Sequence, residues 1–282
     1  MSSTDEATAL ANGTKTEIFG SATKGFAKET KTDEPKISAN EAKTFTSETK
    51  TKDIALSSPQ ARQVLEEAGV DYCCGGGKSL HDACLTAGVS AEEILGRLRE
   101  NSKNVNPEAA NWVTAPLGDL TRHIRDEHHR YVRAAISRIE PLLNKVNGKH
   151  GPAHPELATI QALFGQVGHE MLMHMQKEEY VLFPYIEAME RAANGNGSLE
   201  KPFFQTVRNP IQTMMKEHDA AGDLVRQIHE ASAGYTPPAG ACTSFKALYD
   251  ELEEFETDLH QHVHLENNIL FPRAAEAEAA AA

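Results

Sequence analysis

The 282-residue sequence has few cysteines and no long hydrophobic run. Four cysteines, two of them adjacent, are too few for a disulfide scaffold in a chain of this length, so we expect a reducing, cytoplasmic setting. No apolar stretch approaches the roughly 18 residues that a membrane-spanning helix needs. The opening residues MSSTDEATAL also lack the basic and apolar segments of a secretory signal, so the sequence predicts neither export nor membrane insertion.

Basic residues are scarce relative to acidic ones. Lys and Arg number 28 against 41 Asp and Glu, which gives a formal net charge of −13, and the basic residues are not clustered. Proteins that bind nucleic acids or anionic membranes carry basic patches, so we expect neither as a partner. The content of 40% hydrophobic and 24% charged residues is typical of a globular protein, and the length leaves room for two modest domains.

Two regions precede the longest helical part of the sequence. Residues 1–50 are rich in Thr, Lys, Glu, Ala and Ser and low in hydrophobicity, which is typical of a disordered tail. Residues 51–105 predict a small helical domain. Its start signals include Ser58 and Pro59, an N-cap followed by a proline at the first helical position, and a capping box at Ser90.

The sequence after Trp112 has a helical pattern nearly throughout. Four long helical stretches joined by turn-rich loops predict an all-α, up-down four-helix bundle over residues 112–273. Pro184 is expected to kink the second helix and Pro272 to end the fourth. An alanine-rich tail, 274–282, follows. The predicted long helices span residues 116–145, 155–190, 203–232 and 242–270.

The bundle contains two copies of one pattern. The sequence MHMQKEEYVLFP starts at position 173 and QHVHLENNILFP starts 88 positions later. In each copy a histidine precedes a glutamate by four residues, His174 with Glu178 and His262 with Glu266, so each pair lies on one helix face. A lone pair of this kind is usually a surface ion pair. Two copies in register favour a buried site, which needs a cation to offset the cost of burying such groups.

The other two long helices each add a histidine, in the sequences RDEHHR and MKEHD. Imidazole and carboxylate without thiolate suit iron or manganese and fit structural zinc poorly. Two opposing carboxylates, Glu178 and Glu266, could bridge two ions about 3.5–4 Å apart. Open positions would remain for water, O2, NO or an oxo or hydroxo bridge. The candidate metal ligands are His129, His174, Glu178, His218, His262 and Glu266.

Two features around these ligands stay open at this point. His128 and His129 are adjacent, and because a helix turns about 100° per residue only one can face the core. Acidic residues lie four positions before two of the ligands, Glu170 and Asp258, and Glu217 adjoins a third. They either orient the histidines or line a polar channel, or they belong to a solvated helix face. We expect the remaining histidines near the second copy, at positions 260 and 264, to be exposed.

The segment DYCCGGGKS forms a second candidate site. Its three glycines leave the thiols of Cys73 and Cys74 sterically open, and Lys78 and the flanking helix termini could favour thiolate. Adjacent cysteines are poorly arranged to chelate one ion together. Redox exchange, contact with a damaged cluster, or ligation shared between two chains are the functional interpretations. A tight turn with two packed cysteines is the structural one.

The sequence DYCCGG joined to this bundle resembles the RIC (repair of iron centres) family of di-iron proteins. The resemblance covers about residues 52–273 and includes the sequences KEEYVLFP, EHDAAG, PPAGACT and LENNILFP. It implies a hemerythrin-like bundle with two non-haem iron ions, bridged by Glu178 and Glu266, in a cytoplasmic protein. It places the ligands on the same six residues and selects His129 over its neighbour. It implies nothing about the long N-terminal tail.

The family's function becomes the expectation for this chain. It would restore iron–sulfur clusters damaged by nitrosative or oxidative stress, by supplying iron or by handling NO. Its partners would be damaged iron–sulfur proteins, with NO or O2 as small ligands and a homodimer as one assembly. We expect an iron donor rather than a conventional enzyme, with an NO reductase-like activity as an alternative. A hemerythrin-like O2 or NO sensor, or an iron store, is the rival interpretation.

Overall fold

The computed structural model describes residues 45–101 and 112–281. Residues from Ala42 onward belong to one compact unit. Within the described residues the regular structure is helical, apart from an isolated β-bridge between Lys50 and Ser79. The all-α prediction is therefore confirmed.

The small domain consists of short helices whose ends carry the signals read from the sequence. Ser58 Oγ accepts a hydrogen bond from the Ala61 amide at 3.0 Å, ahead of Pro59. Gly69 has φ +65°, the left-handed conformation that ends a helix and favours glycine. The helices are α1 (Thr51–Ala55), α2 (Pro59–Glu67), α3 (Leu80–Ala87) and α4 (Ala91–Asn101).

Order begins before residue 51. The Leu80 amide donates to the Thr49 carbonyl at 2.8 Å, and Phe45 packs against the core. Residues 45–50, which the sequence analysis assigned to a disordered tail, thus have defined contacts with the small domain. The rest of that predicted tail, and residues 102–111 between the small domain and the bundle, lie outside the described residues.

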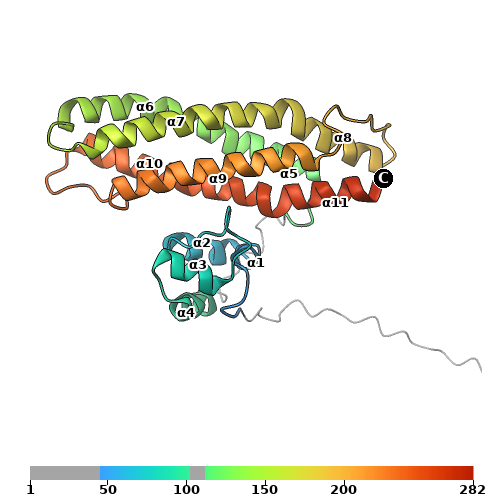
Figure 1. The fold of residues 1–282 in the computed structure, drawn as a ribbon, viewed down its shortest axis with the longest axis horizontal. Helices are drawn as coiled ribbons and strands as arrows, with labels where there is room; N and C mark the ends of the chain where they lie inside the picture. The colour runs from blue at the N-terminus through green and yellow to red at the C-terminus, as the bar shows by residue number, and fades with distance from the viewer. Residues whose placement is uncertain (1–44, 102–111, 282) are drawn as a thin grey trace, which may run out of the picture. The chain divides into compact units, whose positions relative to one another are not determined.

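The four long segments of the bundle run side by side (Figure 1). Three of them contain a short π-helical stretch, labelled η, where the helix widens by part of a residue per turn. The first comprises α5 (Leu117–His123), η1 (Ile124–His129) and α6 (Arg130–His150). The second comprises α7 (Glu156–Lys177), η2 (Glu178–Leu182) and α8 (Phe183–Ala193). The third is α9 (Arg208–Ala231), and the fourth comprises α10 (Thr243–Leu265), η3 (Glu266–Leu270) and α11 (Phe271–Ala281).

Pro272 does not end the fourth helix, so that expectation was wrong. The helix continues through α11, and Pro272 is exposed at the start of that helix, directly after η3. Proline is tolerated there because the first turn of a helix does not need its amide hydrogen. Ala274 and Ala275 are buried, and Glu278 binds the Val207 amide at 2.8 Å. The alanine-rich segment is therefore packed through these residues.

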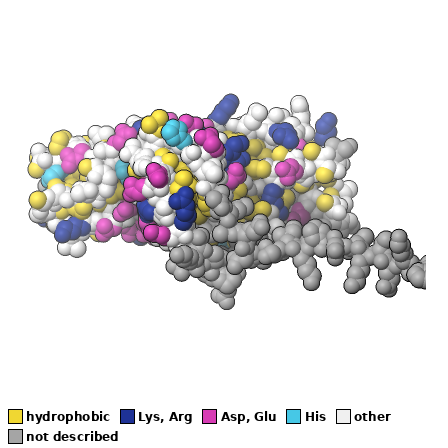
Figure 2. All heavy atoms as spheres, turned by 90° about the horizontal axis from the view of Figure 1, so that it is seen from below, with side chains coloured by type: hydrophobic (Ala, Val, Ile, Leu, Met, Phe, Trp, Pro, Cys, Tyr) yellow, Lys and Arg dark blue, Asp and Glu magenta, His cyan; other side chains and the backbone are white. Residues whose placement is uncertain are grey.

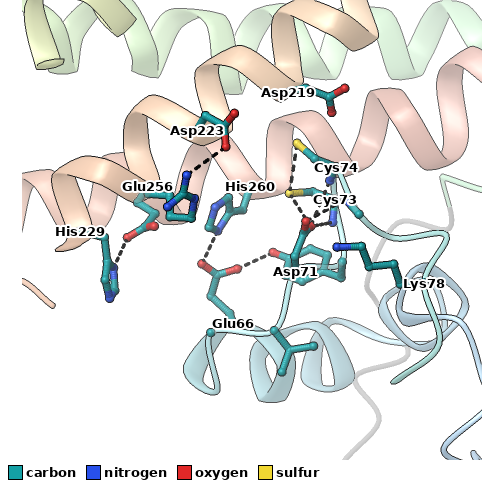
Figure 3. A pocket seen from close by; sticks show the side chains of 16 residues that line it. Glu66, Asp71, Cys73, Cys74, Lys78, Asp219, Asp223, His229, Glu256 and His260 are labelled. Atoms are coloured by element: carbon teal, nitrogen blue, oxygen red, sulfur yellow. Dashed lines mark hydrogen bonds and ion pairs between the residues drawn. The ribbon is translucent and has the colours of Figure 1, made fainter. Parts of the chain in front are cut away.

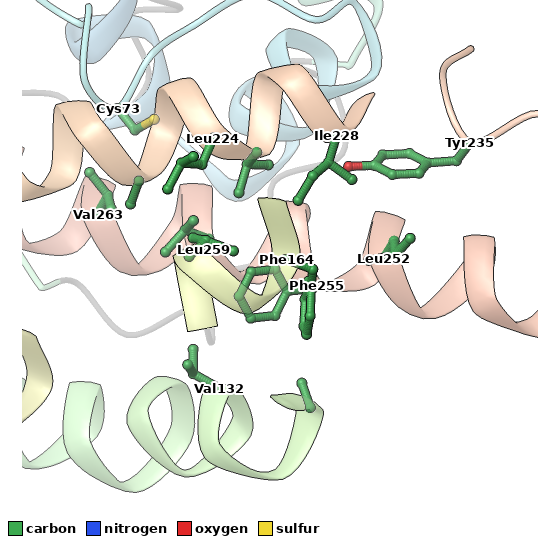
Figure 4. Close-up of a cluster of buried hydrophobic side chains, with 14 of the residues drawn as sticks. Cys73, Val132, Phe164, Leu224, Ile228, Tyr235, Leu252, Phe255, Leu259 and Val263 are labelled. Atoms are coloured by element: carbon green, nitrogen blue, oxygen red, sulfur yellow. The ribbon is translucent and has the colours of Figure 1, made fainter. Parts of the chain in front are cut away.

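Two hydrophobic clusters account for most of the core. One includes Phe164 of α7 and Phe255 of α10, whose rings meet edge to face at 5.2 Å (Figure 4). The other includes Phe183 of α8 and Phe271 of α11. Along α7, η2 and α8, residues of the first cluster precede Glu178 and residues of the second follow it. The candidate ligands thus interrupt an otherwise apolar core.

Candidate metal centre

The six predicted ligands converge from all four long segments. They form two groups, each with its candidate ligand atoms within 4.8 Å of one another, and both groups share Glu178 and Glu266. The first group adds His129 and His262, and the second adds His174 and His218. All six side chains are buried. His128 belongs to neither group.

Each carboxylate faces one histidine from each group. Glu178 lies 3.4 Å from His129 Nε2 and 3.3 Å from His174 Nε2. Glu266 lies 3.0 Å from His218 Nε2 and 3.1 Å from His262 Nε2. The ε-nitrogens of all four histidines therefore point toward the shared carboxylates. This is an arrangement in which two carboxylates can span two metal positions.

The π-helical stretches set these directions. His129 ends η1, while Glu178 and Glu266 begin η2 and η3. A wider turn changes how side chains before and after it are aimed, and such turns are frequent at functional sites. The spacing of four residues between histidine and glutamate is kept, because each pair spans only the last turn of the preceding α-helix.

The charges inside the core fit a cation. Both carboxylate oxygens of Glu178, and Nε2 of His129, are buried without a hydrogen-bond partner in the described part of the chain. Burial opposes ionisation, but the charge of His262 and the hydrogen bond from His218 hold the pKa of Glu266 well below its usual range. Unpaired buried anionic oxygens are costly unless a cation binds them. Donors of this kind, imidazole nitrogen and carboxylate oxygen, suit iron or manganese.

Three of the four histidines are oriented by a hydrogen bond at their other ring nitrogen. Such partners fix the ring and its tautomer in metal sites. The Nδ1 contacts are His129 to Glu179 at 2.7 Å, His174 to Glu217 at 2.8 Å, and His218 to Asn267 at 2.9 Å. Hydrogen bonds from His174 and Lys177, opposed by partial burial, lower the pKa of Glu217 to about 2.

The structure places the three candidate outer acids differently from one another. Glu217 contacts a ligand histidine directly. Asp258 contacts Nδ1 of His128 at 2.9 Å, and Glu170 binds the Gln166 side chain at 2.9 Å. A cavity of about 430 Å³ between α7 and α9 is lined by both Glu170 and Glu217 and reaches His174.

Glu179 and Asn267 were missed from the sequence, although a signal was present. Each directly follows a shared carboxylate, Glu178 or Glu266, at equivalent positions of the two copies. Each reaches a histidine on a neighbouring helix rather than on its own. Sequence spacing along one helix cannot show such contacts.

The expectation that His260 and His264 are exposed was wrong for both, and His264 is buried. Its ring meets that of Tyr72 at 5.4 Å. His260 is bonded to Glu66 at 2.8 Å and is partly buried. The small domain covers this part of α10, which the helical periodicity of the bundle alone could not reveal.

The two adjacent cysteines lie where the small domain meets α9. The Asp71 side chain accepts hydrogen bonds from three successive backbone amides, which fixes the turn. Cys73 is buried, and Cys74 is half-buried with Sγ 3.7 Å from the carbonyl oxygen of His218. Both line a cavity of about 480 Å³ together with His260 and Glu256 (Figure 3).

The thiol of Cys73 is not activated by this environment. Its hydrogen bond with Cys74 and its burial raise the pKa of Cys73 well above the usual value. The suggestion that Lys78 favours a thiolate is therefore wrong for Cys73. The two sulfur atoms lie 3.9 Å apart, and all four cysteines of the chain are free.

The surface offers no strongly basic face in the view of Figure 2, where acidic and basic side chains are interspersed. Among the described residues, the search for a helix with the length and apolar character to span a membrane found none.

A small helical cysteine domain joined to a bundle with paired His and Glu ligand groups defines a hemerythrin-like metal-binding protein. The model of the hemerythrin HHE cation binding domain matches residues 120–274, and a domain of unknown function (DUF542) matches residues 47–102. The chain belongs to the family of iron–sulfur cluster repair proteins that combines these two domains.

Curated relatives match over most of their length. The iron–sulfur cluster repair protein YtfE of Pectobacterium carotovorum subsp. carotovorum is 33% identical over 226 residues, 79% of this chain and 95% of the relative. ScdA of Staphylococcus haemolyticus is 30% identical, over 76% of this chain and 91% of the relative. A probable iron–sulfur cluster repair protein of Haemophilus influenzae is 35% identical, over 77% and 92%.

Proposed function

We propose that this protein repairs damaged iron–sulfur clusters with iron held in the bundle. The observation that carries the proposal is the pair of ligand groups that share Glu178 and Glu266. The relatives, which match most of the chain, are named as iron–sulfur cluster repair proteins.

In this proposal the two groups would hold two non-haem iron ions, with His129 and His262 as ligands in one group and His174 and His218 in the other. Glu178 and Glu266 would serve both groups as shared ligands. Bound ferrous iron would supply exchangeable metal and open positions for NO or O2. The protein's part is to hold the ions with neutral imidazoles, to keep bulk water out through the apolar clusters, and to balance their charge with two carboxylates.

We assign a path to the cavity between α7 and α9. It runs from the surface to His174 past Glu170 and Glu217, so it offers carboxylate oxygens to a cation moving to or from the position between His174 and His218. Asp258, bound to His128, would act on the opposite group of ligands. Glu170→Leu, which leaves the partner of His174 in place, should slow iron release from the position at His174, and unchanged release there would exclude this path.

The cysteine pair is assigned to contact with the client. Cys74, half-buried in the cavity and next to the turn of α9 that carries His218, would be the thiol that contacts the damaged cluster, with Cys73 3.9 Å behind it. Four unpaired cysteines also support a reducing compartment, the cytoplasm. Ligation shared between two chains of a homodimer is the alternative role, and sedimentation with and without iron would reveal it.

The test is recovery of an NO-damaged [4Fe–4S] enzyme incubated with the ferrous protein. Wild type should restore activity. Glu178→Leu should fail because it loses a shared ligand, and Cys73→Ser/Cys74→Ser should be slowed. Cys242→Ser is the matched control, because Cys242 belongs to neither candidate site: it lies at the N-cap position of α10, where serine is favourable, with Sγ 3.2 Å from His150.

Equal recovery by all variants would overturn the repair mechanism. Metal analysis showing one zinc ion per chain would overturn the di-iron assignment. Tight NO or O2 binding without transfer of labelled iron to the client would favour the rival function, a sensor or store. Consumption of NO over many turnovers would instead indicate NO reductase-like activity.

A further inference from the structure

The four ligand histidines are not held equally. Nδ1 of His129, His174 and His218 each has a side-chain partner. Nδ1 of His262 is buried and has no such partner among the residues that the structure describes. The asymmetry lies between two groups that are otherwise alike, since both share the same carboxylates and all four imidazoles are buried.

One substitution in the repeated pattern accounts for the difference. The residue before the ligand histidine is Glu217 on α9 but His128 on η1. Glu217 reaches across to α7 and accepts a hydrogen bond from Nδ1 of His174, the histidine of the first copy. His128 instead lies against His262, with ring centroids 5.6 Å apart and planes inclined by 10°.

Parallel rings cannot exchange a hydrogen bond in the ring plane, which is where imidazole nitrogens donate and accept. His128 also has its own Nδ1 engaged by Asp258 at 2.9 Å. Asp258 lies one turn before His262 on the same helix but contacts His128 rather than His262. His262 is left to be positioned by packing and by Glu266 alone.

We propose that the metal position between His129 and His262 is the weaker of the two and is the one from which iron is donated. This inference rests on the proposed function for its biological meaning but not for its measurement. Loss of an outer hydrogen-bonding partner typically weakens metal binding 10–100-fold. The position between His174 and His218, where both imidazoles are anchored, retains its ion.

The experiment uses the full chain loaded anaerobically with two ferrous ions. Excess ferrous chelator should remove iron in two phases of about one equivalent each, with rates that differ on the order of 10–100-fold. Crystals treated until one equivalent has left are then measured at the iron absorption edge. The anomalous signal should be depleted between His129 and His262. A single phase, or first depletion between His174 and His218, overturns the inference.

Exchanging the outer residues provides the matched variants. His128→Glu combined with Asp258→Asn supplies a carboxylate for His262 without crowding two acids together, and should slow the fast phase about tenfold. Asp258→Asn alone is the control. Glu217→Leu removes the partner of His174 and should bring the slow phase close to the fast one. The assignment would be contradicted if neither rate changed in these variants. Because the variants act on different metal positions, one still tests the assignment if the other folds poorly.

The two hypotheses fail separately. Equal release rates in a protein that still repairs clusters would reject the asymmetry and leave the repair function standing. Unequal release rates in a protein that repairs no client would reject the repair function and leave the asymmetry of the two metal positions standing.

Discussion

At the residue scale, the sequence predicted the ligands because the pattern occurs twice. The spacing of His174 and Glu178, repeated at His262 and Glu266, cannot be explained by core packing. The choice of His129 over His128 needed the family resemblance, because the sequence gives no rotation for the first helix. Glu179 and Asn267 escaped prediction because they act between helices, where distances depend on how the helices cross.

Metal should raise the stability of the wild-type protein and not that of Glu178→Leu. Ligand present at 100 times its Kd stabilises a fold by about 2.7 kcal/mol. For a fold of this size that corresponds to a rise in Tm on the order of 5–10 °C. Thermal unfolding of the metal-free protein, with and without ferrous iron, measures the effect.

The same variant tests what Glu178 does in the absence of metal. The carboxylate lies 3.3 Å from His174 Nε2 and 3.4 Å from His129 Nε2. Burial and Glu266 oppose its ionisation, but these two histidines lower the pKa of Glu178. Because removing one partner of a buried pair is destabilising, we expect metal-free Glu178→Leu to have a lower Tm than metal-free wild type at pH 7. An equal or higher Tm would show that the buried carboxylate destabilises the metal-free fold.

At the element scale, helix positions followed from the sequence but the π-helical stretches did not. A widening by a fraction of a residue per turn is smaller than the uncertainty in reading periodicity over one or two turns. Pro272 was misjudged for a separate reason, because a proline in a continuous helical pattern predicts a helix end. The alanine-rich segment 274–282 was predicted only as a tail, because its alanine and glutamate residues do not reveal which part of the bundle they contact.

Glu278 provides a pH-dependent test of that last helix. Partial burial opposes ionisation, but hydrogen bonds from Thr206, the Val207 amide and Tyr185 lower the pKa of Glu278. A group with a lowered pKa stabilises the fold above its unfolded value, about 4.5, and this contribution disappears as the pH falls through the lowered pKa. Glu278→Gln should therefore cost about 1 kcal/mol or less at pH 7, allowing for solvent screening.

The difference between Glu278→Gln and wild type should shrink as the pH falls below about 4.5. Chemical denaturation at several pH values from 7 down to 3 measures it. Glu276, exposed on the same helix, supplies the control Glu276→Gln. A constant difference at all pH values would mean that the carboxylate charge is not involved.

At the scale of the molecule, the sequence predicted two domains but not their contact. Glu66 of α2 binds His260 of α10, and Asn268 binds the Tyr72 carbonyl at 3.0 Å. These residues belong to patterns that are complete within each domain, so only the folded chain shows that they meet. The meeting brings Cys74 to the turn of α9 that holds His218, so the two candidate sites adjoin the same turn of one helix.

Gly222 is the position at which this contact can be tested with a single substitution. A Cβ atom added to Gly222 would lie 3.5 Å from Cys74 Sγ, an ordinary van der Waals distance, and would meet nothing closer. Gly222→Ala should therefore keep the contact and stabilise α9 by up to about 1 kcal/mol. Gly222→Leu should push Cys74 away, because its larger side chain has no space there.

Loss of the contact should open Cys73, which is only 5% exposed. We expect Gly222→Leu to raise the alkylation rate of Cys73 at least several-fold, while the rate in Gly222→Ala stays within about twofold of wild type. Peptide mass spectrometry measures the alkylation of Cys73 over time. Iron content should be unchanged in both, because Gly222 contributes no ligand. If Gly222→Leu repaired clusters at the wild-type rate with Cys73 exposed, close apposition of the cysteines and the metal centre would not be needed for repair.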